Sequence, residues 1–239
     1  MIRTAVILGA GRGTRLRPIT DSIPKILVPV RGVPLCDRIV DSLIEAGIER
    51  IVFVVGYLSE RIVAHYDRHP HSEKFEYIEQ ATLDGTGGAV RLALPTIEDD
   101  FLVIFGDSLF ARGAVSSVVD APAKNVIGVV EVSDPQRYGV VNVDQAGRIL
   151  EIEEKPERPK SNLAVAGIYK FSGEVKRYFS DLPLSSRGEY EMPDAIRMML
   201  DDDVPVAAVT FDGMFDVGTL DQIEELEAMD DAAFTESFG

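Results

Sequence analysis

Leu8-Gly9-Ala10-Gly11-Arg12-Gly13-Thr14-Arg15-Leu16-Arg17-Pro18 is the most informative stretch of this 239-residue chain. It continues an apolar run at 5–8 that predicts a β-strand. Its three glycines within five residues let backbone N–H groups approach an anion, because no Cβ stands in the way. Its arginines and Lys25 place cations beside that turn. A strand that enters a glycine-rich turn with a cationic flank predicts a polyphosphate site.

Two well-known phosphate loops do not fit this stretch. The dinucleotide fingerprint G-x-G-x-x-G would need a glycine where Thr14 stands, and the Walker A string is absent from the sequence. The order Gly-Arg-Gly-Thr-Arg-Leu-Arg-Pro at 11–18, followed by Pro24-Lys25, resembles the sugar-1-phosphate nucleotidyltransferases. The resemblance implies that Arg15 stabilises the leaving β- and γ-phosphates and that Lys25 contacts the α-phosphate. It assigns nucleotide contacts to the loop residues Leu8, Gly9, Ala10, Gly11, Gly13 and Thr14.

Length and pattern predict one α/β domain over 1–231. The nucleotide-binding half is expected at 1–120, the sugar-phosphate half at 121–231, and a loose tail at 232–239. Expected strands are 3–8, 50–55, 75–79, 101–105, 126–132, 139–143, 148–152, 163–171 and 205–211; expected helices are 34–46, 59–68, 86–94, 191–200 and 219–231. This order predicts a mostly parallel, Rossmann-like sheet with helices on both faces and a small sugar-binding lobe, and ligands at the carboxyl ends of its strands.

The acidic composition restricts the partners. A net charge of −16 argues against nucleic acid. The sequence has no apolar run long enough to span a membrane, and its one cysteine, Cys36, fits a reducing compartment. We therefore expect a cytoplasmic protein, and a homo-oligomer is compatible with this charge. Dispersed acid with few lysines suggests a salt-adapted cytoplasm, while an ordinary acidic enzyme remains the alternative.

Two aspartates suggest a metal site. Asp107 follows the apolar run at 101–105 in a Gly-Asp pair, and Asp216 stands in Phe-Asp-Val-Gly-Thr at 215–219. Read singly, Asp107 is a turn residue and Asp216 part of a helix cap. Within the resemblance, both match the family's metal-binding aspartates and are assigned to Mg²⁺, which binds one or two carboxylates together with phosphate oxygens.

The second half carries sugar-side motifs. Glu153-Glu154-Lys155-Pro156 resembles the family's E-K-P segment, which implies sugar hydroxyls on Glu154 and the sugar phosphate on Lys155. A solvated edge strand would explain the same letters. The resemblance adds Gly139, Asn162 and Gly167 to the sugar-phosphate side. Segment 189–196 resembles another family element, but Pro193 replaces its usual threonine, so we interpret Asp194 as part of a helix start.

The segment 78–89 is expected to read the base through Gln80, with Gly85 and Thr86 opening the next helix. A carboxamide offers a donor and an acceptor, which match N3–H and O4 of uracil or thymine. A register shift by one residue would make Glu79 the reader and favour guanine. The resemblance therefore implies that a nucleoside triphosphate, with UTP favoured, is joined to a sugar 1-phosphate, with glucose 1-phosphate favoured. The alternatives are dTTP with glucose 1-phosphate, GTP with mannose 1-phosphate, and a silent regulatory subunit.

Overall fold

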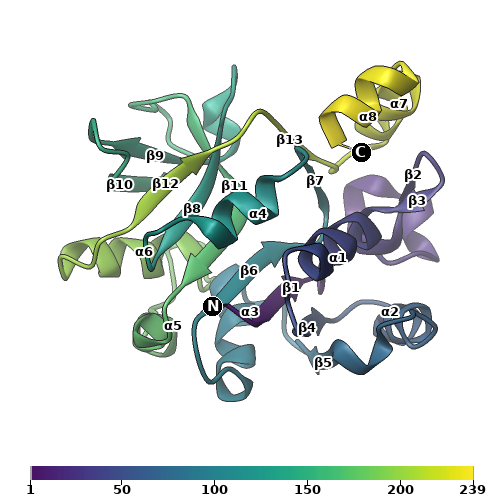
Figure 1. The fold of residues 1–239 in the computed structure, drawn as a ribbon, viewed down its shortest axis with the longest axis horizontal. Helices are drawn as coiled ribbons and strands as arrows, with labels where there is room; N and C mark the ends of the chain where they lie inside the picture. Colours follow the sequence, from purple (N-terminus) through teal and green to yellow (C-terminus); the bar gives the residue numbers. More distant parts are fainter. Residues whose placement is uncertain (1, 239) are drawn as a thin grey trace.

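The computed structural model describes residues 2–238, so Met1 and Gly239, the outer ends of the expected ranges, lie outside it (Figure 1). Its main sheet runs in the order β10-β9-β11-β6-β1-β4-β5, with β8 joined to β11 and β12 joined to β8. The first half supplies four mutually parallel strands, as predicted: β1 (Thr4–Leu8), β4 (Arg50–Val55), β5 (Phe75–Glu79) and β6 (Phe101–Phe105). Their β-branched and aromatic residues are buried between two layers of helices, which suits parallel strands.

The second half joins the sheet through an antiparallel strand, β11 (Leu163–Phe171). Its last residues pair with β6, while Ala164 pairs with β9, and its other edge pairs with β8. The change of partner falls at a bulge containing Gly167, whose φ is +87°. The other strands that this half adds to the main sheet are β8 (Val126–Glu131), β9 (Gly139–Val143), β10 (Ile149–Glu154) and β12 (Ala207–Thr210).

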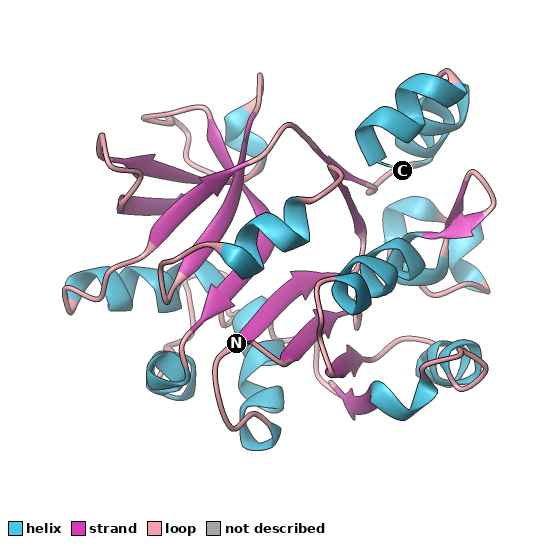
Figure 2. Ribbon diagram, in the orientation of Figure 1, coloured by secondary structure: helices cyan, strands magenta, loops and turns pink. Residues whose placement is uncertain are grey.

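Helices cover both faces of the sheet, which confirms the predicted fold class (Figure 2). One core joins the sheet to α1 (Leu35–Glu45), α2 (Ser59–Tyr66) and α4 (Ala114–Asp120); the other joins it to α3 (Thr86–Ala93), α5 (Lys176–Ser180) and α6 (Met192–Asp201). The sequence did not predict α4 or α5. Helix α4 is rich in valine and serine, which are weak helix formers, and its packing stabilises it instead. Within residues 2–238, no helix has the length and apolar character needed to cross a membrane.

The expected loose tail is wrong for the described residues, because 231–238 form helix α8 (Asp231–Phe238). Phe234 is only 4% exposed and lies between the guanidinium groups of Arg31 and Arg38, 4.9 and 5.2 Å from its ring centroid. Together with α7 (Leu220–Ala228), α8 packs beside the small hairpin of β2 (Pro29–Val30) and β3 (Val33–Pro34) (Figure 1). A short helix with one aromatic anchor leaves too weak a periodic pattern to be predicted.

This anchor gives a stability prediction. Phe234→Ala should lower the free energy of unfolding by about 3 kcal/mol, because it removes a buried aromatic ring and leaves a cavity. Thermal and urea unfolding followed by circular dichroism would measure the change. Thr235→Ala, on the exposed side of the same helix, is the matched control and should unfold like the wild type. Equal stabilities of the two variants would contradict the anchoring role.

Candidate active site

The sheet brings the glycine loop and Asp107 to one edge. Strands β1 and β6 are parallel neighbours, with Leu8 paired to Phe105. The loop leaves β1 after Leu8, and Asp107 follows β6, so both emerge at the carboxyl ends of adjacent strands. The Gly106 N–H donates to the Leu8 carbonyl and ties the two exits together.

A second short ribbon brings Asp216 to the same place. Strand β13 (Met214–Asp216) pairs antiparallel with β7 (Ser108–Phe110), in a register that puts Asp216 opposite Ser108. Lys25, whose side chain is 11% exposed, stands between the carboxylates: its Nζ is 2.6 Å from Asp107 Oδ2 and 4.0 Å from Asp216 Oδ1. The structure therefore brings together two carboxylates and a lysine that lie far apart in the sequence.

The charges of this cluster act on one another. Burial, and then the neighbouring charge of Asp107, raise the pKa of Asp216, while Lys25, Arg15 and Arg137 oppose that rise. The nearby positive charge thus offsets part of the cost of keeping both carboxylates ionised, while the net shift of the Asp216 pKa remains upward. Both groups are hard oxygen donors, the kind that Mg²⁺ prefers. No group of three or more metal-ligating side chains exists among residues 2–238, so this pair would leave the remaining positions to phosphate oxygens and water.

Some residues of the glycine loop line a cleft, and others pack against the protein beneath the loop. Leu8, Ala10, Gly11 and the catalytic candidates Arg15 and Lys25 line a cleft of about 480 Å³. The other three predicted loop residues, Gly9, Gly13 and Thr14, are not among its lining residues.

Gly9 and Gly13, which do not line the cleft, have packing roles instead. A Cβ at Gly9 would lie 2.8 Å from Ile26 Cδ1, and one at Gly13, where φ is +59°, would lie 2.9 Å from Thr20 Cγ2. Any side chain there would push the loop away from its support. The Gly13 carbonyl also accepts a hydrogen bond from Thr20 Oγ1 at 2.8 Å, which holds the turn that presents Arg15.

The predicted base-reading residues reach the opposite wall. Gln80, Gly85 and Thr86 line the cleft, whereas Glu79, the alternative reader, is exposed and does not. Gln80 differs from the expectation in one respect. Its Nε2 already donates to Asp84 Oδ1 at 2.8 Å and to the Gly85 carbonyl at 3.3 Å, so its donor half is used within the protein and only its oxygen is left for a ligand.

Sugar-side candidates Gly139, Glu154 and Lys155 also line the cleft. Successive residues of a regular strand point to opposite faces of the sheet. On such a strand, Glu154 and Lys155 could not both point into the cleft. Lys155 has a φ of +46°, in the left-handed region, and this departure lets its Nζ lie 3.5 Å from Glu154 Oε1. The Lys155 N–H donates to the Tyr138 carbonyl, which holds the turn. A solvated edge strand would not need this conformation.

The structure does not place Asn162 and Gly167 in the cleft. Asn162 is exposed at the start of β11, where its carbonyl accepts the Val132 N–H. Gly167 supports the cleft indirectly: a Cβ there would lie 2.8 Å from the Phe105 ring, which is itself a lining group. The missing side chain at Gly167 therefore makes room for Phe105, while its neighbours Val165 and Ala166 line the cleft themselves.

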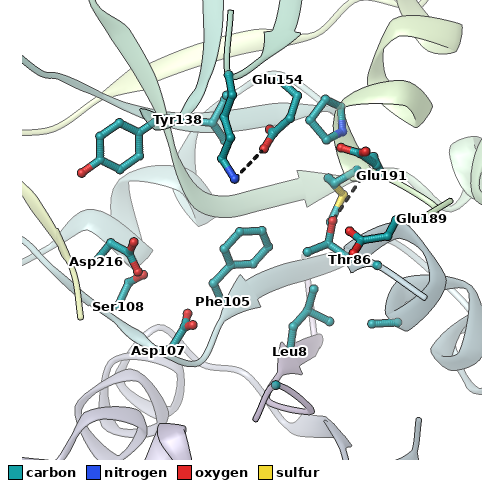
Figure 3. Close-up of a pocket in the computed structure, with 18 of the residues that line it drawn as sticks. Leu8, Thr86, Phe105, Asp107, Ser108, Tyr138, Glu154, Glu189, Glu191 and Asp216 are labelled. Atoms are coloured by element: carbon teal, nitrogen blue, oxygen red, sulfur yellow. Dashed lines mark hydrogen bonds and ion pairs between the residues drawn. The ribbon is translucent and has the colours of Figure 1, made fainter. Parts of the chain in front are cut away.

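Several lining residues were not predicted as site residues. Figure 3 shows Phe105 in the middle of the cleft, Asp107 and Asp216 to one side of it, and Glu154, Glu189 and Glu191 to the other. Glu189 and Glu191 belong to segment 189–196, which the sequence had flagged but assigned to helix architecture. A charged residue on each side of Tyr190, just before a helix, was the signal available. The remaining unpredicted charged and tyrosine side chains in the lining are Arg137, Tyr138, Tyr169 and Arg187.

Arg187 connects the carboxylates of this wall. Its Nε and Nη2 donate to the two oxygens of Glu191, and Nη2 lies 3.7 Å from Glu154 Oε1. The Arg187 guanidinium holds the pKa of Glu191 below its usual range against the opposing effect of burial. Both sides of the cleft thus combine cations with carboxylates, an arrangement suited to a polyhydroxylated molecule that carries phosphate.

Comparison with known proteins agrees with this geometry. A family model described as nucleotidyl transferase matches residues 4–232. The chain belongs to this family, and the resemblance to sugar-1-phosphate nucleotidyltransferases that the motifs indicated is confirmed.

Two of the relatives differ in how much of their own length this chain covers. The chain is 43% identical to a protein of Methanococcus aeolicus named bifunctional protein GlmU, over 82% of this chain and 46% of that protein. It is 35% identical to the UTP–glucose-1-phosphate uridylyltransferase AglF of Haloferax volcanii, over 93% of this chain and 94% of that one. The chain thus spans about half the length of the first relative and nearly all of the second.

Solved structures extend the match to the whole fold. A putative glucose-1-phosphate thymidylyltransferase from Bacillus anthracis superposes with a TM-score of 0.84 at 30% identity, over 99% of this chain and 97% of that one. A UDP-glucose pyrophosphorylase complexed with UDP-glucose gives a TM-score of 0.86 at 26% identity, over 99% of this chain and all of that one.

Proposed function

We propose that the protein transfers a uridylyl group from UTP to glucose 1-phosphate, with Mg²⁺, and releases pyrophosphate. The single observation that carries this proposal is the cleft, which places two carboxylates and Lys25 opposite the wall of Glu154 and Lys155. A nucleoside triphosphate on the first wall and a sugar phosphate on the second would meet between them. The near full-length similarity to a relative named for UTP and glucose 1-phosphate supports the choice of substrates.

The reaction forms a bond between a sugar-phosphate oxygen and the α-phosphorus, and it breaks the bond from the α-phosphorus to the pyrophosphate oxygen. The nucleophile needs no general base, because the second pKa of a phosphate monoester is about 6. Catalysis then consists of positioning and charge stabilisation. Lys25 would hold the α-phosphate, Arg15 the departing β- and γ-phosphates, and Lys155 the sugar phosphate.

Asp107 and Asp216 would hold Mg²⁺, whose charge would offset that of the phosphates. Their shared position fits this role, since burial and mutual repulsion raise the pKa of Asp216 and a bound divalent cation would favour its ionised form. The chain itself would supply only these two carboxylates and would leave room for phosphate oxygens.

Transfer from dTTP is the second candidate. The Gln80 oxygen accepts equally well from N3–H of uracil and of thymine, and a solved neighbour is named as a putative glucose-1-phosphate thymidylyltransferase. GTP is less favoured than either, because Glu79 lies outside the cleft lining.

The test is pyrophosphate release with UTP, dTTP, GTP, CTP and ATP, each crossed with the 1-phosphates of glucose, N-acetylglucosamine, galactose and mannose. Low and molar salt would be compared, with omission of sugar phosphate and addition of EDTA as controls. We expect the highest kcat/KM with UTP and glucose 1-phosphate. Greater activity with dTTP would select the second candidate. Activity with GTP alone, or none in any combination, would overturn the proposal.

A further inference from the structure

The neighbours of Gln80 fix the direction in which its carboxamide donor and acceptor point. Its side chain is 5% exposed and lines the cleft, so each of its polar atoms needs a partner or a ligand. The two hydrogens on Nε2 are directed at the Asp84 carboxylate and the Gly85 carbonyl. A carboxamide has no other donor. Towards a base in the cleft, Gln80 therefore offers only an acceptor, Oε1.

This orientation follows from chemistry and not from the naming of amide atoms. An ionised carboxylate and a backbone carbonyl can only accept hydrogen bonds. If the Gln80 amide were turned over, its oxygen would face both acceptors with no hydrogen between them, and this buried arrangement is costly. Of the two acceptors, only the one on Asp84 belongs to a side chain and so depends on the residue type.

Asp84 is itself held firmly. Its second oxygen lies 3.8 Å from Nη2 of Arg91, whose guanidinium is 3.9 Å from the Tyr190 ring centroid. The Asp84 carbonyl accepts the Tyr190 N–H at 2.7 Å. Gly88 leaves space for the carboxylate, since a Cβ there would lie 2.2 Å from Oδ1. The carboxylate is thus built into the start of α3 and is not a mobile surface group.

We propose that Asp84 is a positioning residue that makes Gln80 an obligate acceptor and thereby selects the base. The inference rests on the proposed nucleotidyl transfer. Bases that carry a hydrogen on the ring nitrogen of their pairing edge can donate to Oε1; these are uracil and thymine at N3 and guanine at N1. Cytosine and adenine have a bare acceptor nitrogen there. In the pose that brings this ring nitrogen to Oε1, such a base leaves two acceptors facing each other. It would have to shift so that its exocyclic amino group, the one donor on that edge, reached Oε1 instead, and the cleft therefore disfavours it.

Asp84→Asn is the decisive variant, because it keeps the shape and adds a donor. The introduced amide can donate to Gln80 Oε1, which leaves only the Gly85 carbonyl, the longer contact at 3.3 Å, to oppose a turned-over carboxamide. Gln80 can then turn its NH₂ toward the cleft and donate to N3 of cytosine. With glucose 1-phosphate, the ratio of kcat/KM for UTP to that for CTP should fall about tenfold, the discrimination that one hydrogen bond provides. Calorimetric titration with UMP and CMP should show the same loss of preference without turnover.

Asp144→Asn is the matched control. Asp144 also accepts two hydrogen bonds in a turn, from the backbone of Ala146 and Arg148, but it lies outside the cleft. The Asp144→Asn protein should have the same ratio of kcat/KM for UTP to that for CTP as the wild type. If Asp84→Asn fails to fold, as judged by thermal unfolding, then Asp84→Ser, which is too short to reach Gln80, should give the same fall in the ratio.

The outcomes separate the two proposals. A folded Asp84→Asn protein with an unchanged UTP to CTP ratio overturns the role of Asp84 and leaves the transferase function intact. A wild-type protein that prefers CTP overturns this inference and the choice of UTP as substrate, and leaves nucleotidyl transfer itself intact. A wild-type protein that neither turns over nor binds any of these nucleotides overturns the proposed function, and this inference with it.

Discussion

Replacing Asp107 with asparagine should lower kcat for pyrophosphate release by about 10²–10³, as for the removal of one preorganised charge contact. The change keeps the shape of the side chain but removes half of the carboxylate pair. It also replaces the 2.6 Å ion pair to Lys25, whose ammonium would lose its closest anionic partner. Steady-state rates at saturating substrates and increasing Mg²⁺ would measure the loss, and higher Mg²⁺ should not restore the rate.

Asp100→Asn is the matched control for this variant. Asp100 immediately precedes β6, whereas Asp107 follows the same strand at its other end, and Asp100 Oδ1 accepts the Gly173 N–H far from the cleft. It should retain wild-type turnover. An Asp107→Asn protein that keeps more than about a tenth of the wild-type rate would contradict the proposed role of the carboxylate pair.

Arg15→Ala should cost a similar factor, about 10²–10³ in kcat, because it removes positive charge where the departing pyrophosphate gains negative charge. The structure also explains why this arginine can sit so close to the chain that carries Asp216. A Cβ at Gly218 would lie 3.1 Å from Arg15 Nη2, so the absent side chain makes room for the guanidinium. Arg15→Lys keeps the charge but lacks the planar guanidinium, so its kcat should lie between those of the wild type and Arg15→Ala.

The neighbouring Arg17 provides the control. Its side chain is exposed and pairs with Asp21 at 3.2 Å, outside the cleft lining. Arg17→Ala should therefore leave kcat and KM near those of the wild type, although the two substitutions remove the same group from the same loop. If both alanine variants were equally active, the assignment of Arg15 to the leaving group would be refuted.

Local patterns were enough to predict most of the sheet. Apolar runs gave the parallel strands, and α1 ends at Glu45, one residue before the predicted end at 46 and shortly before Gly47, where φ is +84°. The Asp144–Gly147 turn between β9 and β10 follows the same local logic. Helix α4 and helix α8 were missed for one reason: each is stabilised by contacts with distant residues, which a sequence pattern does not contain.

The site was predictable to the extent that its motifs are local. Part of the glycine loop (Leu8, Ala10 and Gly11), Gln80 and the Glu154–Lys155 pair were predicted and line the cleft. What the sequence could not supply was relative placement. It did not reveal that the Gln80 donors are already engaged, that Lys155 leaves the strand conformation, or that Arg187 bridges Glu191 and Glu154. Each of these depends on side chains brought together from separate segments.

The pairing of β7 with β13 has a consequence for the synthesis of the protein on the ribosome. Asp107 and the glycine loop are synthesised early, and the parallel strands around them can fold as they emerge. Asp216 comes much later, and only its pairing with β7 brings the second carboxylate into place. A nascent chain that has not reached this residue holds the glycine loop and Asp107 without the second carboxylate. Under the proposed function, nucleotidyl transfer would therefore begin only late in translation, when Asp216 has joined the fold.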